Sequence, residues 1–385
     1  MNHRQGWSIK MARQAMAGVI VLLSLSTQVL AEDSEDCRGA SSGSPRIAAC
    51  TRIIEDGTRG PGSRATAYRN RANAWMESGD NDRAMTDYDN AIALDPNDTD
   101  AYNDRGLIWL DKGENNSAIN DFDRAIKLDP GKASAYYNRG LAWAHKGDNA
   151  RALVDYSRAI ELNPTYMQAY NNRGFVLNRR GQFDRAIADF DKAISLDPKH
   201  PFAYNNRAIS WGAKGDAERA IADYSQAITL NPTYVNPYGS RGIYYFYDGD
   251  LAKAQADFAA AAELAPPNAY FAIWVDLTER HGGGIGNLRQ ATSKLDMTQW
   301  PAPLVRMFLG EQTPEEALTS AEDSPPGTKR GNLCDANLYI AEFHWLEGRT
   351  DKALPFYQRA ANDCPHDFIE YVAAGKRLHA LGVSP

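Results

Sequence analysis

Small and aromatic residues recur with one fixed period through the middle of the chain. With the recurring tyrosine numbered 4, position 8 is always Gly or Ala, positions 20 and 27 are always Ala, and position 24 is always Tyr or Phe. The pattern predicts six stacked units over residues 65–268 rather than a single mixed core. The tyrosines stand 34 residues apart, at Tyr68, Tyr102, Tyr136, Tyr170, Tyr204 and Tyr238.

Each repeat is predicted to form two short helices, so the fold class is all-α. The small residues at positions 8, 20 and 27 let the two helices approach closely, and aromatic residues fill the space between them. A glycine at position 15, from Gly79 to Gly249, ends the first helix where a left-handed conformation is needed. A proline at position 32 ends the second helix because proline cannot continue one.

The repeats are flanked by segments that follow the pattern less closely. Residues 46–57 align with a second helix, which predicts a half-repeat cap within 32–64 that begins with Ser44 as N-cap and Pro45 as its first residue. Residues 269–333 are expected to form a degenerate helical region, with one helix starting at Thr313. A further repeat is predicted over 334–367, and a closing helix over 368–385.

The first 31 residues have the layout of a secretory signal peptide. A basic stretch through Arg13 precedes an apolar run of Ala15 to Leu30, and small residues end at Ala31. The alternative is an uncleaved membrane anchor, although the run is shorter than a spanning helix needs. Because no cysteine stands at the cut site, we expect no lipid anchor.

The cysteines support the same compartment. Cys37 and Cys50 form one pair near the start of the mature chain, and Cys334 and Cys364 form another near its end. An even set of cysteines in an exported protein indicates disulfides, and we predict one bridge within each pair.

Charge excludes two classes of partner. The formal charge is −7, and it becomes −10 when the segment with Arg4, Lys10 and Arg13 is removed. An acidic chain without a Lys or Arg cluster lacks the electrostatic footprint for nucleic acid or anionic lipid.

Catalytic and metal motifs have little support. Residues 39–43 (GASSG) satisfy G-x-S-x-G, but a nucleophile at Ser41 would need a strand, a turn and a helix around it. No metal-binding or phosphate-binding motif is present. We therefore expect a non-catalytic protein without a cofactor, and a hydrolase built on Ser41 is the minor alternative.

The repeat resembles the tetratricopeptide repeat in every signature column, over residues 65–268. This resemblance implies a right-handed solenoid of helix pairs whose first helices line a concave groove. Residues 300–310 (WPAPLVRMFLG), the repeat after them and a closing helix resemble the C-terminal half of NlpI-type tetratricopeptide lipoproteins of the bacterial envelope. The chain departs from that type because it has no lipid-bearing cysteine.

Two columns of the first helix are candidates for binding a peptide. Asparagine carries a donor and an acceptor, so a row of asparagines can hold the backbone of an extended peptide. The alternative is that they solvate an empty groove or bond neighbouring helices. Position 9 adds an apolar floor, which Phe202 and Phe246 extend. The predicted peptide-binding residues are Asn70, Asn138, Asn172, Asn206, Asn171, Asn205, Tyr137 and Phe175.

Position 7 is always Arg and position 23 is always Asp, which predicts a structural ladder of ion pairs between helices.

The combined interpretation is a periplasmic scaffold or adaptor that binds extended segments of other proteins. The NlpI-type resemblance implies peptidoglycan hydrolases or a processing protease as partners, and a homo-oligomer is also compatible with the pattern. The alternative is a self-associating structural solenoid with no ligand in its groove.

Overall fold

The computed structural model describes residues 33–40, 43–366 and 368–383. The predicted signal peptide and Ser41 lie outside the described residues. Within them every regular element is a helix, so the all-α prediction is confirmed. None of the described helices combines the length and apolar character that crossing a membrane requires.

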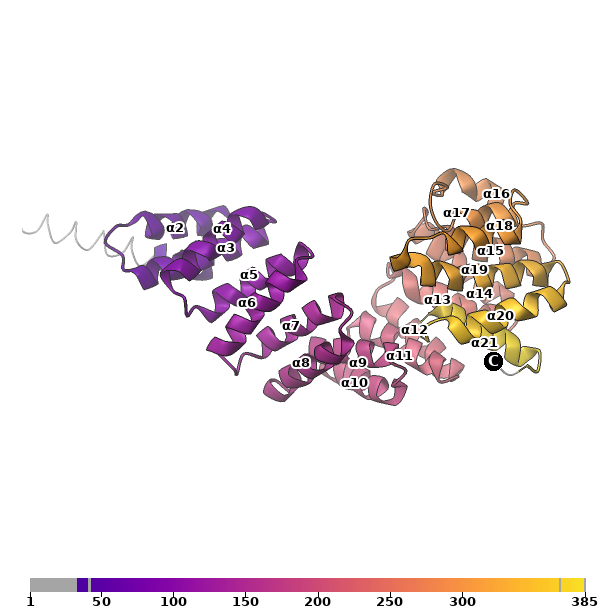
Figure 1. Ribbon diagram of the computed structural model, residues 1–385, viewed down its shortest axis with the longest axis horizontal. Helices are drawn as coiled ribbons and strands as arrows, with labels where there is room; N and C mark the ends of the chain where they lie inside the picture. The colour runs from indigo at the N-terminus through magenta and orange to yellow at the C-terminus, as the bar shows by residue number, and fades with distance from the viewer. Residues whose placement is uncertain (1–32, 41–42, 367, 384–385) are drawn as a thin grey trace, which may run out of the picture. The chain divides into compact units, whose positions relative to one another are not determined.

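The chain divides into two compact units, Met1–Pro164 and Thr165–Pro385. The first unit, coloured indigo to magenta in Figure 1, holds the cap and three repeats. Each repeat is a pair of helices joined by a short turn. The elements are η1 (Asp36–Ala40), α2 (Ser44–Glu55), α3 (Pro61–Glu77), α4 (Asn81–Leu94), α5 (Thr99–Asp111), α6 (Asn115–Leu128), α7 (Ala133–His145) and α8 (Asn149–Leu162).

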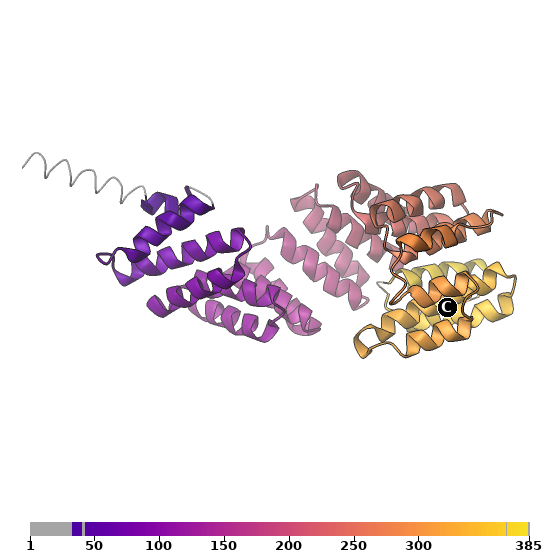
Figure 2. The same cartoon turned by 90° about the horizontal axis from the view of Figure 1, so that it is seen from above.

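The second unit begins with three further repeats and closes with a less regular helical region. Within it, α21 packs against α20 and also contacts α13. Figure 2 shows this unit, coloured pink to yellow, from above. Its elements are α9 (Met167–Arg179), α10 (Phe183–Leu196), α11 (Pro201–Ala213), α12 (Ala217–Leu230), α13 (Val235–Tyr247), α14 (Leu251–Leu264), α15 (Ala269–His281), α16 (Leu288–Ala291), η2 (Thr292–Lys294), α17 (Ala302–Phe308), α18 (Pro314–Glu322), α19 (Pro326–Leu346), α20 (Thr350–Asp363) and α21 (Ile369–Ala380).

Close contact between the two helices of a repeat explains the small residue at position 8. A Cβ atom added at Gly174 would lie 2.8 Å from the ring of Phe190, the aromatic residue at position 24 of the same repeat. The same substitution at Gly140 would place the new atom 2.7 Å from the ring of Tyr156. The glycine therefore gives the aromatic side chain the space that it fills in the core.

The position-15 glycines have the predicted left-handed backbone, with φ between 71° and 83° from Gly79 to Gly249. We expect Gly147→Ala, at φ 79°, to lower the free energy of unfolding by about 1 kcal/mol, because a Cβ atom is disfavoured in this conformation. Gly62→Ala is the control, since Gly62 lies in the first turn of α3 with no atom within 4 Å of its new Cβ. Urea unfolding of both variants checks this, and an equal cost at Gly62 would contradict it.

Each end of the described chain carries a disulfide. Cys37 is bonded to Cys50, with Cα atoms 4.8 Å apart, and both side chains are buried beside α3. Cys334 in α19 is bonded to Cys364 at the end of α20, with Cα atoms 5.5 Å apart. The first bridge joins η1 to α2 within the cap, and the second joins the two helices of the last helix pair.

One predicted helix start is wrong. The N-cap of α2 is Gly43 rather than Ser44, because a positive φ of 62° turns the chain into the helix at that residue. The helix that carries the repeat predicted from Cys334, α19, starts earlier, at Pro326. Proline is accepted in the first turn of a helix, and nothing between it and Cys334 interrupts the helix.

Candidate functional site

The arginines at position 7 bind within their own repeat. Each guanidinium donates from Nε and Nη2 to the two carboxylate oxygens of the position-23 aspartate, at 2.7–2.8 Å. These forked pairs join the first helix to the second and confirm the predicted ladder. The pairs are Arg71–Asp87, Arg105–Asp121, Arg139–Asp155, Arg173–Asp189, Arg207–Asp223 and Arg241–Asp257.

The third guanidinium nitrogen links a repeat to the one before it. Nη1 of Arg139 donates to Asp123 at 2.5 Å, and Nη1 of Arg207 donates to Asp191 at 2.6 Å. Hydrogen bonds to the two aspartates raise the pKa of both arginines above its ordinary value. These arginines therefore use their guanidinium groups in ion pairs within the protein, as the sequence predicts.

In the first unit the predicted peptide-binding asparagines face protein atoms. Asn138 is 6% exposed and donates from Nδ2 to Oδ1 of Asn103 in the preceding repeat at 3.0 Å. Asn70 is also buried, with its Nδ2 4.0 Å from Sγ of Cys37. The ring of Tyr137 lies 5.9 Å from that of Tyr156. Burial leaves both amides little surface for a ligand.

In the second unit the asparagines form a chain of hydrogen bonds along the first helices. Asn206 donates to Asn171 of the preceding repeat at 3.2 Å, and Asn171 donates to its neighbour Asn172 at 3.2 Å. Asn205 is buried and donates to Asn206 at 3.4 Å. These contacts match the alternative in which the asparagines bond neighbouring helices, and their binding of a peptide stays a prediction.

Aspartate replaces asparagine at position 6 of the second repeat. Asp104 accepts a hydrogen bond from Asn103 at 3.0 Å. Burial raises the pKa of Asp104 above its ordinary value, although the hydrogen bond from Asn103 lowers it in part. This carboxylate is the acidic member of an otherwise neutral row.

Two phenylalanines remain exposed on first helices of the second unit. Phe175 in α9 is 42% exposed and lies one helical turn after Asn172. Phe202 in α11 is 46% exposed, and its ring lies 4.8 Å from that of Tyr234. The prediction that Phe246 extends this apolar floor is wrong. Phe246 is 4% exposed because it packs against Trp274 in the C-terminal core.

The C-terminal region buries acidic residues that the repeat pattern does not predict. Glu342 in α19 is fully buried and accepts hydrogen bonds from the hydroxyls of Tyr247 and Tyr357, both at 2.6 Å. Arg377 of α21 lies 3.3 Å from the same carboxylate. The signal in the sequence is a lone glutamate inside the apolar stretch 338–346.

A second buried acidic site joins α21 to α19. Asp335 accepts hydrogen bonds from the Tyr270 hydroxyl at 2.5 Å and the Trp300 indole at 2.9 Å, and it is hydrogen-bonded to Glu370. Burial and the neighbouring carboxylate raise the pKa of Glu370 to about 8. Over the described part of the chain, no cluster of His, Cys, Asp and Glu side chains is arranged to hold a metal ion.

The stacked, ladder-linked helix pairs define an α-solenoid of the kind whose repeats contact only their neighbours. Family models described as tetratricopeptide repeat match residues 133–166, 168–200 and 203–234, and one described as TPR repeat matches 72–113 and 106–147. The chain therefore contains tetratricopeptide repeats between residues 72 and 234.

Solved structures are similar to this chain. A tetratricopeptide repeat protein from Parabacteroides merdae is 21% identical over 66% of this chain and 99% of that one, with a TM-score of 0.51. YrrB, described as a TPR protein with an unusual peptide-binding site, is 26% identical over 50% of this chain and 96% of its own, with a TM-score of 0.42. MamA is 29% identical over 44% and 92% of the two chains, with a TM-score of 0.40. The first of these supports the solenoid fold.

Proposed function

We propose that this tetratricopeptide repeat protein is a non-catalytic scaffold that binds extended segments of other proteins on the first helices of its second unit. The observation that carries the proposal is the exposure of Phe175 and Phe202 beside the half-buried amides of Asn172 and Asn206. Positions 2 and 9 are seven residues apart, two helical turns, so these phenylalanines occupy equivalent faces of their helices. Burying one such ring under a ligand contributes about 1.5–3 kcal/mol.

The proposed compartment is the periplasm. The layout of residues 1–31 and the two disulfides support export, because disulfides persist in oxidising compartments. The similarity of residues 299–371 to NlpI-type proteins extends the proposal to envelope enzymes, such as peptidoglycan hydrolases or a processing protease, as partners.

Photo-crosslinking in the source bacterium tests the proposal. Phe175→p-benzoylphenylalanine is expected to give discrete crosslinked species that contain another protein. The matched control is Val154→p-benzoylphenylalanine, because Val154 is 68% exposed but lies on α8, a second helix. Crosslinks of equal yield at both positions, or none at position 175, would count against the proposal.

The alternative is a self-associating solenoid with no ligand in its groove, and the hydrogen bonds between asparagines of successive repeats support only the second part of it. Light scattering over a range of protein concentrations separates the two functions. Peptide binding predicts that the double variant Asn172→Ala, Asn206→Ala loses partner capture and keeps its mass, whereas self-association through the C-terminal region predicts a mass that rises with concentration and unchanged capture.

A further inference from the structure

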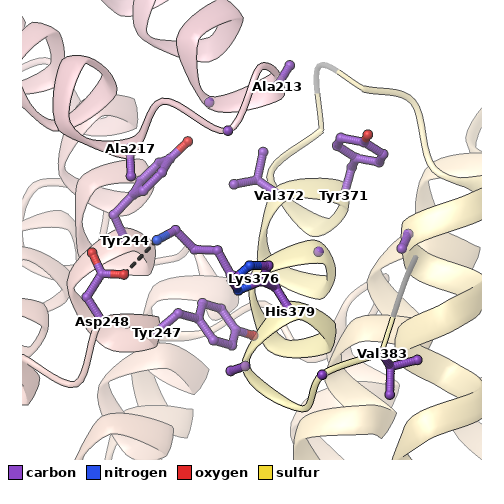
Figure 3. Close-up of a pocket in the computed structure, with 16 residues that line it drawn as sticks. Ala213, Ala217, Tyr244, Tyr247, Asp248, Tyr371, Val372, Lys376, His379 and Val383 are labelled. Atoms are coloured by element: carbon purple, nitrogen blue, oxygen red, sulfur yellow. Dashed lines mark hydrogen bonds and ion pairs between the residues drawn. The ribbon is translucent and has the colours of Figure 1, made fainter.

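A cavity of about 730 Å³ lies within the second unit, beside α21 (Figure 3). One wall is the turn between α11 and α12, a second is the end of α13, and the third is α21. Small side chains such as Ala213 and Ala217 leave the space open, and Val372 gives it an apolar surface. Its volume falls in the range of about 300–1,000 Å³ that is typical of small-molecule sites.

The wall of this cavity contains a hydroxyl group without a partner. Tyr244 is 1% exposed, and its hydroxyl has no hydrogen-bond partner among the described residues. Figure 3 shows it directed away from α13, towards the turn that follows α11 and towards Val372. A buried hydroxyl left unpaired costs about 1–3 kcal/mol, so a ligand that pairs it gains that free energy.

The repeat register explains why this hydroxyl is unpaired. In the preceding repeat Ser210, at position 10, donates to Oδ1 of Asn178, at position 12 of the repeat before it, at 3.0 Å. Tyr244 stands at position 10 of the next repeat, and the facing position 12 is Gly212. A side chain at Gly212 would overlap the tyrosine hydroxyl, so the glycine admits the ring but offers no acceptor. Every other residue at position 10 is smaller than tyrosine.

The charged groups around the cavity are already neutralised. Nζ of Lys376 lies 2.7 Å from Asp248 and 4.9 Å from the centre of the Tyr244 ring. The hydroxyl of Tyr247 is engaged by Glu342. The remaining side-chain hydrogen-bonding groups are the hydroxyls of Tyr244 and Tyr371, the other two N–H bonds of Lys376 and the imidazole of His379. Because the cavity carries no uncompensated charge from Lys376 or Asp248, it does not favour a charged ligand.

We propose that the cavity beside α21 binds an uncharged, mainly apolar small molecule that bears an oxygen to accept a hydrogen bond from Tyr244. This inference goes beyond the scaffold function, because it concerns a different surface and a different class of ligand. A molecule in this position contacts α21 and two repeats at once, so its binding holds the C-terminal helix in place.

Two probes of similar shape test the proposal on the full chain. Acetophenone has a carbonyl oxygen and cumene has only hydrocarbon, so the two differ in the one group that Tyr244 recognises. In titrations followed by nuclear magnetic resonance, acetophenone is expected to bind at least fivefold more tightly than cumene. Tyr244→Phe is expected to remove this preference without weakening cumene, whereas the control Tyr238→Phe, outside the cavity, leaves it intact.

Filling the cavity gives an independent test that does not depend on the tyrosine. Val372→Trp is expected to abolish binding of both probes while circular dichroism shows an unchanged helix content. Unaltered binding in Val372→Trp, or a preference for acetophenone that survives in Tyr244→Phe, would overturn the proposal. Tighter binding of N-acetylphenylalanine methylamide than of acetophenone would overturn the small-molecule assignment in favour of a partner's side chain.

Discussion

The variant Asp155→Ala is expected to lose about 3–5 kcal/mol of free energy of unfolding, measured by urea unfolding of the full chain with far-ultraviolet circular dichroism. Removing the buried partner leaves the guanidinium of Arg139 with only the exposed carboxylate of Asp123. Asp155 is 4% exposed at its side chain and accepts two hydrogen bonds from Arg139, at 2.7 and 2.8 Å. Alanine leaves the Nε and Nη2 groups of this guanidinium without acceptors.

The same arginine provides the matched control. Asp123 contacts Nη1 of Arg139 at 2.5 Å, but its side chain is 52% exposed. Asp123→Ala is therefore expected to cost less than about 1 kcal/mol, because solvent screens an exposed pair. Similar losses in the two variants would show that burial does not control the strength of the ladder.

The stability of the second unit is expected to fall by about 3 kcal/mol as the pH rises from 5 to 8. An unfolded glutamate releases its proton near pH 4.5, whereas Glu370 in the folded chain keeps its proton until about pH 8. The folded state therefore binds the extra proton between these values. This contribution to stability is fully present below pH 4.5 and is lost as the pH rises through the folded pKa. The raised pKa of Asp335 acts in the same direction.

The variant Glu370→Gln tests the origin of this slope. Glutamine keeps the shape of the side chain and cannot ionise, so thermal unfolding between pH 5 and 8 is expected to show a flatter dependence and a higher midpoint at pH 8. Glu263→Gln, at an exposed position of α14, is the control and should behave as the unaltered protein. A slope that persists in Glu370→Gln would assign the pH dependence to other groups.

The sequence predicts those parts of the molecule in which one contact is repeated. The small residues at position 8, the position-15 glycines and the Arg–Asp pairs each solve a local problem in six equivalent places. The role of Asp155 can therefore be predicted, because the other five repeats also have an aspartate at position 23. The adjacent asparagines at positions 5 and 6 of the fourth and fifth repeats also carried a signal for the bond from Asn206 to Asn171.

The C-terminal region could not be predicted in this way because its contacts join segments far apart in sequence. Phe246 follows the repeat register, but α15 adds Trp274 and so buries it. Glu342, Glu370 and the cavity depend on where α21 packs, and no period in the sequence encodes that position. The one sign of the cavity in the sequence is that Tyr244 is larger than every other residue at position 10 of the repeat.

The third guanidinium nitrogen of the ladder arginines links successive repeats through different acceptors. Nη1 of Arg207 donates to the carboxylate of Asp191 in the preceding repeat, whereas Nη1 of Arg241 donates to the neutral hydroxyl of Ser225 at 2.8 Å. At the boundary between the fifth and sixth repeats, α21 adds a further connection. It packs Val372 against the fifth repeat and pairs Lys376 with Asp248 of the sixth. Loss of the C-terminal helix would therefore remove contacts from two interior repeats at once.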